Sequence, residues 1–158
     1  MRRIFLTIFV IFPLLLSAQI MKGKAVKIAD GDTFTLLVND HEQVRIRIDG
    51  IDAPEKGQAF GNRAKEYLSG MIWGEMLTVC VTKTDRYGRS IGKVSTPSIE
   101  DVGLEMIKAG YAWQYRDYNK EQSYEEAEKL ARKNRNGLWL DKNPIRPQDF
   151  RKARKNRK

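Results

Sequence analysis

The sequence of 158 residues is poor in the side chains that build thiol and imidazole sites, because it holds one cysteine and one histidine. The single cysteine, Cys80, excludes an internal disulfide and a CxxC metal site, and its place in the apolar run LTVCV predicts a buried, inert thiol. The single histidine, His41, lies in the polar stretch NDHE, where a solvent-facing role is expected. Ser-His-Asp and Cys-His catalysis are therefore excluded, and a general base has to be a carboxylate, a lysine or a tyrosine.

Long apolar runs are also scarce, and the longest one lies at the N-terminus. Residues 4–16, IFLTIFVIFPLLL, follow the basic start MRR and precede the small residues of SAQ. This run is shorter than the roughly 20 residues that a membrane-spanning helix needs. The pattern predicts a signal peptide over residues 1–18, with cleavage after Ala18. We expect an exported protein, periplasmic or secreted, that is not held in a membrane after cleavage.

The formal net charge of +9 is concentrated near the C-terminus. Between positions 146 and 158 the chain has seven lysines and arginines against one acidic residue, Asp149. Residues 143–158 are therefore predicted to form a basic tail, a solvated and flexible arm. Such an arm either adds salt-sensitive affinity for a polyanion or serves only solubility. The remaining residues, 19–142, have the length of one globular domain.

Strand patterns come early in the chain and helix patterns come later. Alternating apolar residues predict strands at 22–29, 32–39, 43–50, 75–83 and 89–95. Apolar residues at helical spacing predict helices at 58–72, 98–110 and 123–134. Ser123 and Glu126 have the spacing of a capping box at the start of the last helix. The order predicts a mainly β fold with α, of the α+β class: a five-stranded OB-fold barrel with about three helices.

The second and third predicted strands form a hairpin that gathers acidic residues at one end. A tight turn centred on the DH of NDHE pairs Phe34 with Arg47 and Asp32 with Asp49. Because side chains alternate along a strand, the charged members of these pairs share one face. Further carboxylates follow in the stretch IDGIDAPE. The residues expected together are Asp32, Arg47, Asp49, Asp52 and Glu55.

Such a cluster suits a hard divalent cation such as calcium, which prefers oxygen ligands and leaves positions open for water and a substrate oxygen. Arg89, in the turn TDRYGRS, opens a later strand and is either an ordinary surface charge or a second site arginine. Together with Arg47 it would form a clamp for a phosphate, since each guanidinium matches two phosphate oxygens. For Asp30 and Asp49 the sequence allows three roles: a turn residue, a hydrogen-bond partner of a metal-binding residue, or an additional metal ligand.

The motifs occur in an order that resembles the staphylococcal nuclease, or thermonuclease, family. They are ADGDT (29–33), VRIRIDGIDAPE (44–55), DRYGR (85–89), AGYAW (109–113) and RNGLW (135–139). The resemblance covers about residues 22 to 140. It implies an OB-fold barrel and a secreted or periplasmic, calcium-dependent phosphodiesterase. Such an enzyme cuts DNA and RNA and leaves 5′-hydroxyl and 3′-phosphate ends.

The resemblance also implies a role for each acidic residue that matches the family's motif. Asp32 and Asp52 resemble the carboxylate ligands of calcium. The carbonyl of Ala53 is implied as a further ligand; the family often has threonine there, but a backbone oxygen does not depend on the side chain. Glu55 is similar to the general base that orients or deprotonates the attacking water.

The basic and aromatic positions carry the remaining implied roles. Arg47 and Arg89 resemble the pair that holds the phosphate and stabilises the charge of the transition state. Tyr87 is implied in a phosphate contact and Tyr115 in stacking near a base, although the run YAWQYRDY allows more than one alignment.

Two other classes of function compete with the enzyme. An OB-fold module that binds nucleic acid without cutting it is disfavoured by the retained carboxylates and arginines. An extracellular calcium-dependent interaction domain leaves the paired arginines unexplained. We expect a monomer that acts on DNA and RNA; the preference between them, and between internal and terminal cutting, is left open.

Overall fold

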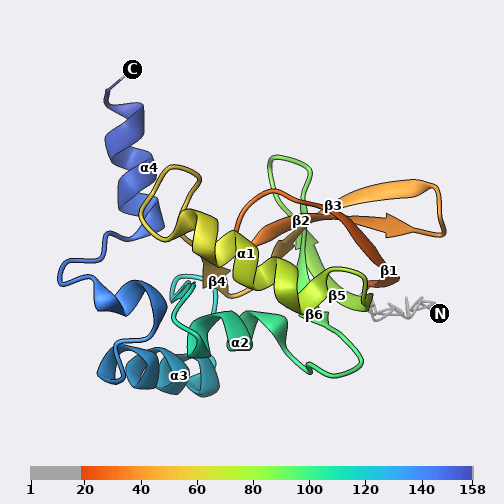
Figure 1. Ribbon diagram of the computed structural model, residues 1–158. Coiled ribbons are helices and arrows are strands. Elements are labelled where there is room, and N and C mark those ends of the chain that lie inside the picture. Colours follow the sequence, from red (N-terminus) through yellow and green to blue (C-terminus); the bar gives the residue numbers. More distant parts are fainter. Residues whose placement is uncertain (1–18, 158) are drawn as a thin grey trace, which may run out of the picture.

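The computed structural model describes residues 19–157, and Figure 1 draws residues 1–18 and 158 only as a trace. The predicted signal peptide and its cleavage site therefore lie outside the described residues. Within residues 19–157, no helix has the length and apolar character needed to cross a membrane.

Five strands close into a barrel, as predicted. They are β1 (Gln19–Ile28), β2 (Thr33–Val38), β3 (Glu42–Ile48), β5 (Met76–Thr84) and β6 (Ser90–Ser95). Their order around the barrel is β1-β2-β3-β6-β5. All neighbours are antiparallel except β3 and β6, which run parallel. The α+β class and the five-stranded OB-type barrel are confirmed.

Period-two alternation places the apolar side chains of the strands inside the barrel. Phe34, Leu36 and Ile46 have no exposed surface, and burial of each such side chain contributes about 1.5–3 kcal/mol. Cys80 lies between two inward-facing valines of β5, so its own side chain faces outward and is exposed. The prediction of a buried thiol is wrong, because strand alternation decides the direction of a side chain even within an apolar run.

The β2–β3 hairpin is shifted by one residue from the predicted register. Val38 pairs with Glu42, which leaves a connecting loop of three residues, 39–41. Asn39 and Asp40 adopt left-handed conformations with φ of 50° and 60°. The backbone N–H of His41 donates to the carbonyl of Val38 at 3.3 Å. Short polar side chains tolerate the left-handed region, so the longer loop is feasible.

Core packing gives the physical reason for this register. The structure pairs Phe34 with Ile46 and Thr33 with Arg47, so that two fully buried apolar side chains lie opposite each other. A slip of one residue would turn one strand's apolar set away from the core. The predicted pairing of Asp32 with Asp49 is therefore wrong.

The three predicted helices are present, and two short helical segments follow them. The segments are α1 (Gly61–Ile72), α2 (Val102–Lys108), α3 (Gln122–Lys133), the 3₁₀ turn η1 (Gly137–Leu140) and α4 (Pro147–Lys155). In Figure 1, α1 crosses the front of the barrel, α2 and α3 lie below it, and α4 lies at the upper left, beside the loop that precedes α1. The predicted capping box does not form, because α3 begins at Gln122 and has no side-chain cap.

The C-terminal segment predicted as a flexible arm is instead a docked helix. Proline at the first position of α4 favours a helix start there. Phe150 borders a hollow of about 110 Å³ together with Pro54 and Phe60. The amide of Gln58 donates to the carbonyl of Ile145 at 2.7 Å. These contacts hold α4 beside the loop that precedes α1, and the two lie side by side in Figure 1.

A second, two-stranded sheet supports the stretch that follows β3. It pairs β4 (Ile51–Asp52) with β7 (Trp113–Gln114). The N–H of Gln114 donates at 2.7 Å to the carboxylate of Glu128, a side chain of α3 that is buried. That carboxylate also accepts two hydrogen bonds from Arg132. Helix α3 thus anchors β7, and β7 positions β4.

Candidate active site

Asp32 is a buried carboxylate at the entrance to β2, and both of its oxygens are engaged. Oδ1 accepts from the hydroxyl of Thr33 at 2.8 Å. Oδ2 accepts from the N–H of Ala53 at 3.1 Å and faces Nη1 of Arg47 at 2.7 Å. Burial raises the pKa of Asp32, but the Arg47 charge and the hydrogen bonds outweigh it and hold this pKa below its ordinary value. Asp32 is therefore ionised at neutral pH.

Arg47 joins the two predicted metal-binding aspartates. Its Nη2 donates to Oδ1 of Asp52 at 3.2 Å and to the carbonyl of Ile51 at 3.1 Å, while Nη1 faces Asp32. Burial lowers the pKa of Arg47, but the two carboxylates raise it above its ordinary value, so the guanidinium stays charged. The β4–β7 pairing places Asp52 within reach of a residue on β3. The predicted grouping of Asp32, Arg47 and Asp52 is present in the structure.

Arg89 approaches the same cluster from the start of β6. The parallel pairing of β3 with β6 brings Ser90 opposite Ile46, one position from Arg47. Asp85 holds the guanidinium of Arg89, with Nε and Nη2 at 2.8 and 2.7 Å from its Oδ2. Nη1 of Arg89 donates to the hydroxyl of Thr33 at 3.4 Å, and that hydroxyl donates to Asp32. Arg47 thus contacts Asp32 directly, and Arg89 is linked to Asp32 through the hydroxyl of Thr33.

Glu55 lies in the loop between β4 and α1, beside Asp52. Its backbone N–H donates to the side-chain oxygen of Gln58 at 3.0 Å. Its carboxylate is partly exposed and accepts from Nη1 of Arg151, on α4, at 2.6 Å. The same guanidinium contacts both oxygens of Asp52 at 3.1 Å. Burial, opposed by this contact, raises the pKa of Asp52.

Sequence reasoning missed Arg151. The only available signal was the excess of positive charge near the C-terminus. Arg151 and Asp52 are 99 positions apart, and no local pattern connects residues at that separation.

The two predicted substrate-binding tyrosines each lie beside one of the arginines. Tyr87 is 67% exposed in the β5–β6 turn, with its ring centroid 5.6 Å from Cζ of Arg89. The ring of Tyr115 lies 5.8 Å from Cζ of Arg47 and packs against Tyr118. Aromatic rings next to cationic groups suit contact with a nucleotide, but the roles of both tyrosines stay predictions.

The two aspartates that the sequence left open lie in different places. The carboxylate of Asp30 accepts from the N–H of Asp32 at 3.1 Å; burial, and then the charge of Asp32, raise the pKa of Asp30 to about 7. Asp49 instead accepts from the N–H of Gly50 and from the hydroxyl of Thr82. The expectation that Asp49 shares the site face is wrong, and the register shift explains it.

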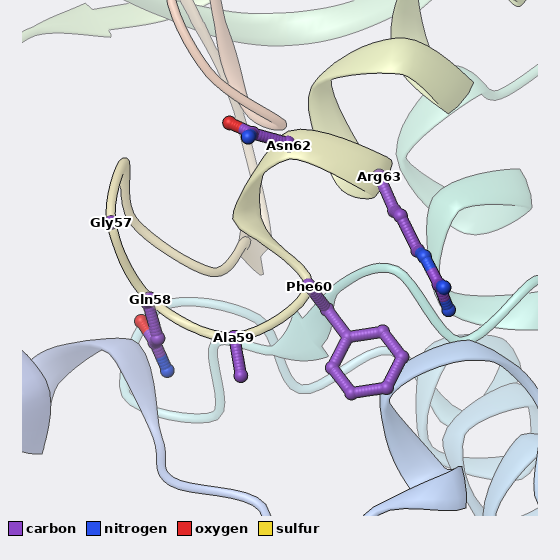
Figure 2. A pocket seen from close by; sticks show the side chains of 6 residues that line it. All are labelled: Gly57, Gln58, Ala59, Phe60, Asn62 and Arg63. Carbon is purple, nitrogen blue, oxygen red and sulfur yellow. The ribbon is translucent and has the colours of Figure 1, made fainter.

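A hollow in the described residues lies beside the carboxylate cluster and not on it. It has a volume of about 600 Å³ and is lined by Gly57, Gln58, Ala59, Phe60, Asn62 and Arg63. Figure 2 shows the loop before α1 curving around it, with Phe60 and Arg63 pointing to the same side and Asn62 pointing away. None of the predicted site residues lines this hollow, so the charged cluster is the better candidate for chemistry.

The donor atoms fit a hard divalent cation in part. Among residues 19–157, no three His, Cys, Asp or Glu side chains converge as a ready ligand set. Asp32 and Asp52 nevertheless both form ion pairs with the guanidinium of Arg47, so their carboxylate oxygens are close together. Two carboxylates and the backbone carbonyl of Ala53 are all oxygen donors, which is the chemistry that calcium prefers, with positions left for water and substrate.

Comparison with known proteins agrees with the fold and the motifs. A family model described as "Staphylococcal nuclease homologue" matches residues 45–141. A "Micrococcal nuclease" of Shigella flexneri is 41% identical over 85% of this chain and 83% of its own. An "Uncharacterized endonuclease" of Haemophilus influenzae is 37% identical over 98% of this chain and 88% of its own. The chain therefore belongs to the staphylococcal nuclease family and is a hydrolase of the nuclease class.

Proposed function

We propose that the protein is a calcium-dependent phosphodiesterase that cuts DNA and RNA and leaves 5′-hydroxyl and 3′-phosphate ends. The observation that carries this proposal is the guanidinium of Arg47, which links the buried carboxylates of Asp32 and Asp52. Arg89 joins them through Thr33. Negative and positive charges are thus concentrated where a cation and a phosphodiester would meet.

The proposed roles follow from the position of each side chain. Arg47 and Arg89 bind the phosphate oxygens and stabilise the added negative charge of the transition state. Glu55 accepts the proton of the water whose oxygen bonds to phosphorus, while the bond from phosphorus to the 5′ oxygen breaks and that oxygen takes up a proton. Calcium held by Asp32, Asp52 and the Ala53 carbonyl would supply further positive charge at the phosphate.

The proposal predicts large activity losses from Glu55→Gln and Arg89→Ala. Loss of one donor aimed at the transition state costs about 10²–10³ in kcat. The measurement is hydrolysis of single-stranded DNA, and of RNA, in calcium and in EDTA. Matched controls are Glu66→Gln and Arg45→Ala, because both side chains are exposed and lie on α1 and β3, near the site residues in sequence. Both controls should keep wild-type rates.

Product ends test the cleavage chemistry separately. Fragments with 5′-hydroxyl ends accept a phosphate from polynucleotide kinase without prior phosphatase treatment. If folded wild-type protein in calcium cuts neither substrate, the enzyme proposal is wrong; retained binding of the same DNA would then indicate a binding module.

We also propose that the protein is exported to the periplasm or the medium, as a monomer, after removal of residues 1–18. The support is the sequence pattern of a basic start, a short apolar run and small residues before Gln19.

A further inference from the structure

Arg151 of helix α4 contacts two carboxylates of the candidate active site, although no predicted role in the site belongs to it. Its Nη1 lies 2.6 Å from Glu55 Oε1 and 3.1 Å from Asp52 Oδ1, and its Nη2 lies 3.1 Å from Asp52 Oδ2. The planar fork of the guanidinium thus covers both oxygens of Asp52. These are the oxygens that the proposed function assigns to a cation.

The position of Arg151 does not depend on these ion pairs alone. Phe150, its neighbour in α4, borders the hollow formed with Pro54 and Phe60. The hydrogen bond from Gln58 to the carbonyl of Ile145 ties the chain before α4 to the loop that carries Glu55. The packing of α4 against the loop that carries Glu55 therefore places the guanidinium beside the carboxylates. This packing keeps the guanidinium near them if its ion pairs open.

Arg151 also differs from Arg47 in its access to solvent. The side chain of Arg47 is 11% exposed and that of Arg151 is 38% exposed. The Arg151 guanidinium is already partly hydrated in the site, so its return from water costs little desolvation, whereas the buried Arg47 would have to be desolvated again on return. Of the two arginines that contact Asp52, Arg151 is the one that can leave.

The local charge balance indicates that Arg151 opposes the binding of a divalent cation. Three carboxylates, Asp32, Asp52 and Glu55, face two guanidiniums. With Arg151 in place the cluster holds little net negative charge. Both oxygens of Asp52 already accept hydrogen bonds from Arg151. A divalent cation would have to displace Arg151 from at least one oxygen and would then lie close to its positive charge.

We propose that Arg151 is a positioning residue of the active site that acts through Asp52 and Glu55: it holds the two carboxylates together and competes with the divalent cation for Asp52. This inference rests on the proposed function, because that function places the cation at Asp52. A residue with only a structural role would stabilise the site, and its loss would weaken cation binding or leave it unchanged. The loss of a residue that competes with the cation would instead make cation binding tighter.

The test is a calorimetric titration of the purified protein with calcium, without nucleic acid. Arg151→Gln should bind calcium about tenfold more tightly than wild type, since one nearby positive charge and its three hydrogen bonds to Asp52 and Glu55 are removed. Lys152→Gln is the matched control, because Lys152 is the next residue of the same helix, is exposed, and loses the same charge; its affinity should stay within about twofold of wild type. Arg151→Lys, which keeps the charge but not the fork, should be intermediate.

A second substitution locates the effect. Asp52→Asn placed in the Arg151→Gln protein should remove the tighter binding, and circular dichroism should show that each variant is folded. Calcium affinity that Arg151→Gln leaves unchanged or weakens, in a wild type that binds calcium, would overturn the competition. If neither wild type nor Arg151→Gln binds calcium, the calcium assignment of the proposed function is itself wrong.

Discussion

At the residue scale, the placement of Arg89 depends on one neighbouring carboxylate. Oδ1 of Asp85 accepts from the backbone N–H groups of Tyr87 and Arg89 at 2.9 and 3.0 Å, which shapes the β5–β6 turn. Oδ2 receives two donors of the Arg89 guanidinium. One aspartate therefore sets both the turn and the direction of the arginine.

The pKa of Asp85 decides the pH range of this effect. Its slight burial raises the pKa, but hydrogen bonds from Arg89 and Tyr87 and the Arg89 charge lower it below the ordinary value of 3.8. A carboxylate with a lowered pKa exerts its stabilising effect above the ordinary value, and the effect is lost as the pH falls through the lowered one. At neutral pH Asp85 is ionised and holds Arg89.

We predict that Asp85→Asn lowers kcat for single-stranded DNA by about 10- to 100-fold, because misplacement of a group by about 1 Å can cost 10² in rate. Asparagine keeps the oxygen that shapes the turn but loses the charge that holds Arg89. The ratio of wild-type to variant kcat should stay constant from neutral pH down to about pH 4.

The control for this prediction is Asp40→Asn in the exposed β2–β3 loop. Asparagine suits the left-handed φ of 60° at that position, so activity should not change. Equal kcat for Asp85→Asn and wild type at neutral pH would show that Asp85 does not position Arg89.

At the element scale, the start of α1 is packed against the loop that carries Glu55. A Cβ atom on Gly61 would lie 2.2 Å from the carbonyl oxygen of Glu55. A Cβ atom on Gly70, in the same helix, would meet nothing within 4 Å. A side chain at position 61 would therefore clash with the backbone, whereas a side chain at position 70 would not. Helix propensity alone predicts the same effect of alanine at both positions.

We predict that Gly61→Ala lowers the free energy of unfolding by about 1–3 kcal/mol, because the added methyl group has to push backbone atoms apart. It should also lower kcat, since the displaced backbone belongs to Glu55. Gly70→Ala should raise the free energy of unfolding by about 0.5–1 kcal/mol, because alanine loses less conformational entropy in a helix. Urea denaturation measures both changes; a Gly61→Ala protein as stable and active as wild type would contradict the close packing.

The short sheet that places Asp52 could not be predicted from periodicity. Strands β4 and β7 have two residues each, too few for an alternating pattern to appear. Their support comes from Glu128 on α3, whose burial could not be inferred from a charged helical stretch. The motif IDAPE indicated which residues matter but not what holds them.

At the scale of the whole molecule, β1 pairs with β5 from Gln19 on, directly after the predicted cleavage site. We predict that the exported protein has the intact mass of a chain that starts at Gln19, measured by mass spectrometry of the periplasmic and culture fractions. Replacing Ala18 by a large residue should block cleavage and leave the longer chain associated with cells. A full-length mass in the exported fractions would contradict the proposed signal peptide.

The sequence by itself determined the five barrel strands, the three main helices, and the identity of the charged residues around Asp32, because alternation and short motifs are local properties. The tertiary structure decided the hairpin register, since the burial of Phe34 against Ile46 outweighs the choice of loop length. It also decided that Arg151 lies on Asp52 and Glu55. Contacts between residues about a hundred positions apart depend on how whole elements pack, and a linear pattern carries no record of that packing.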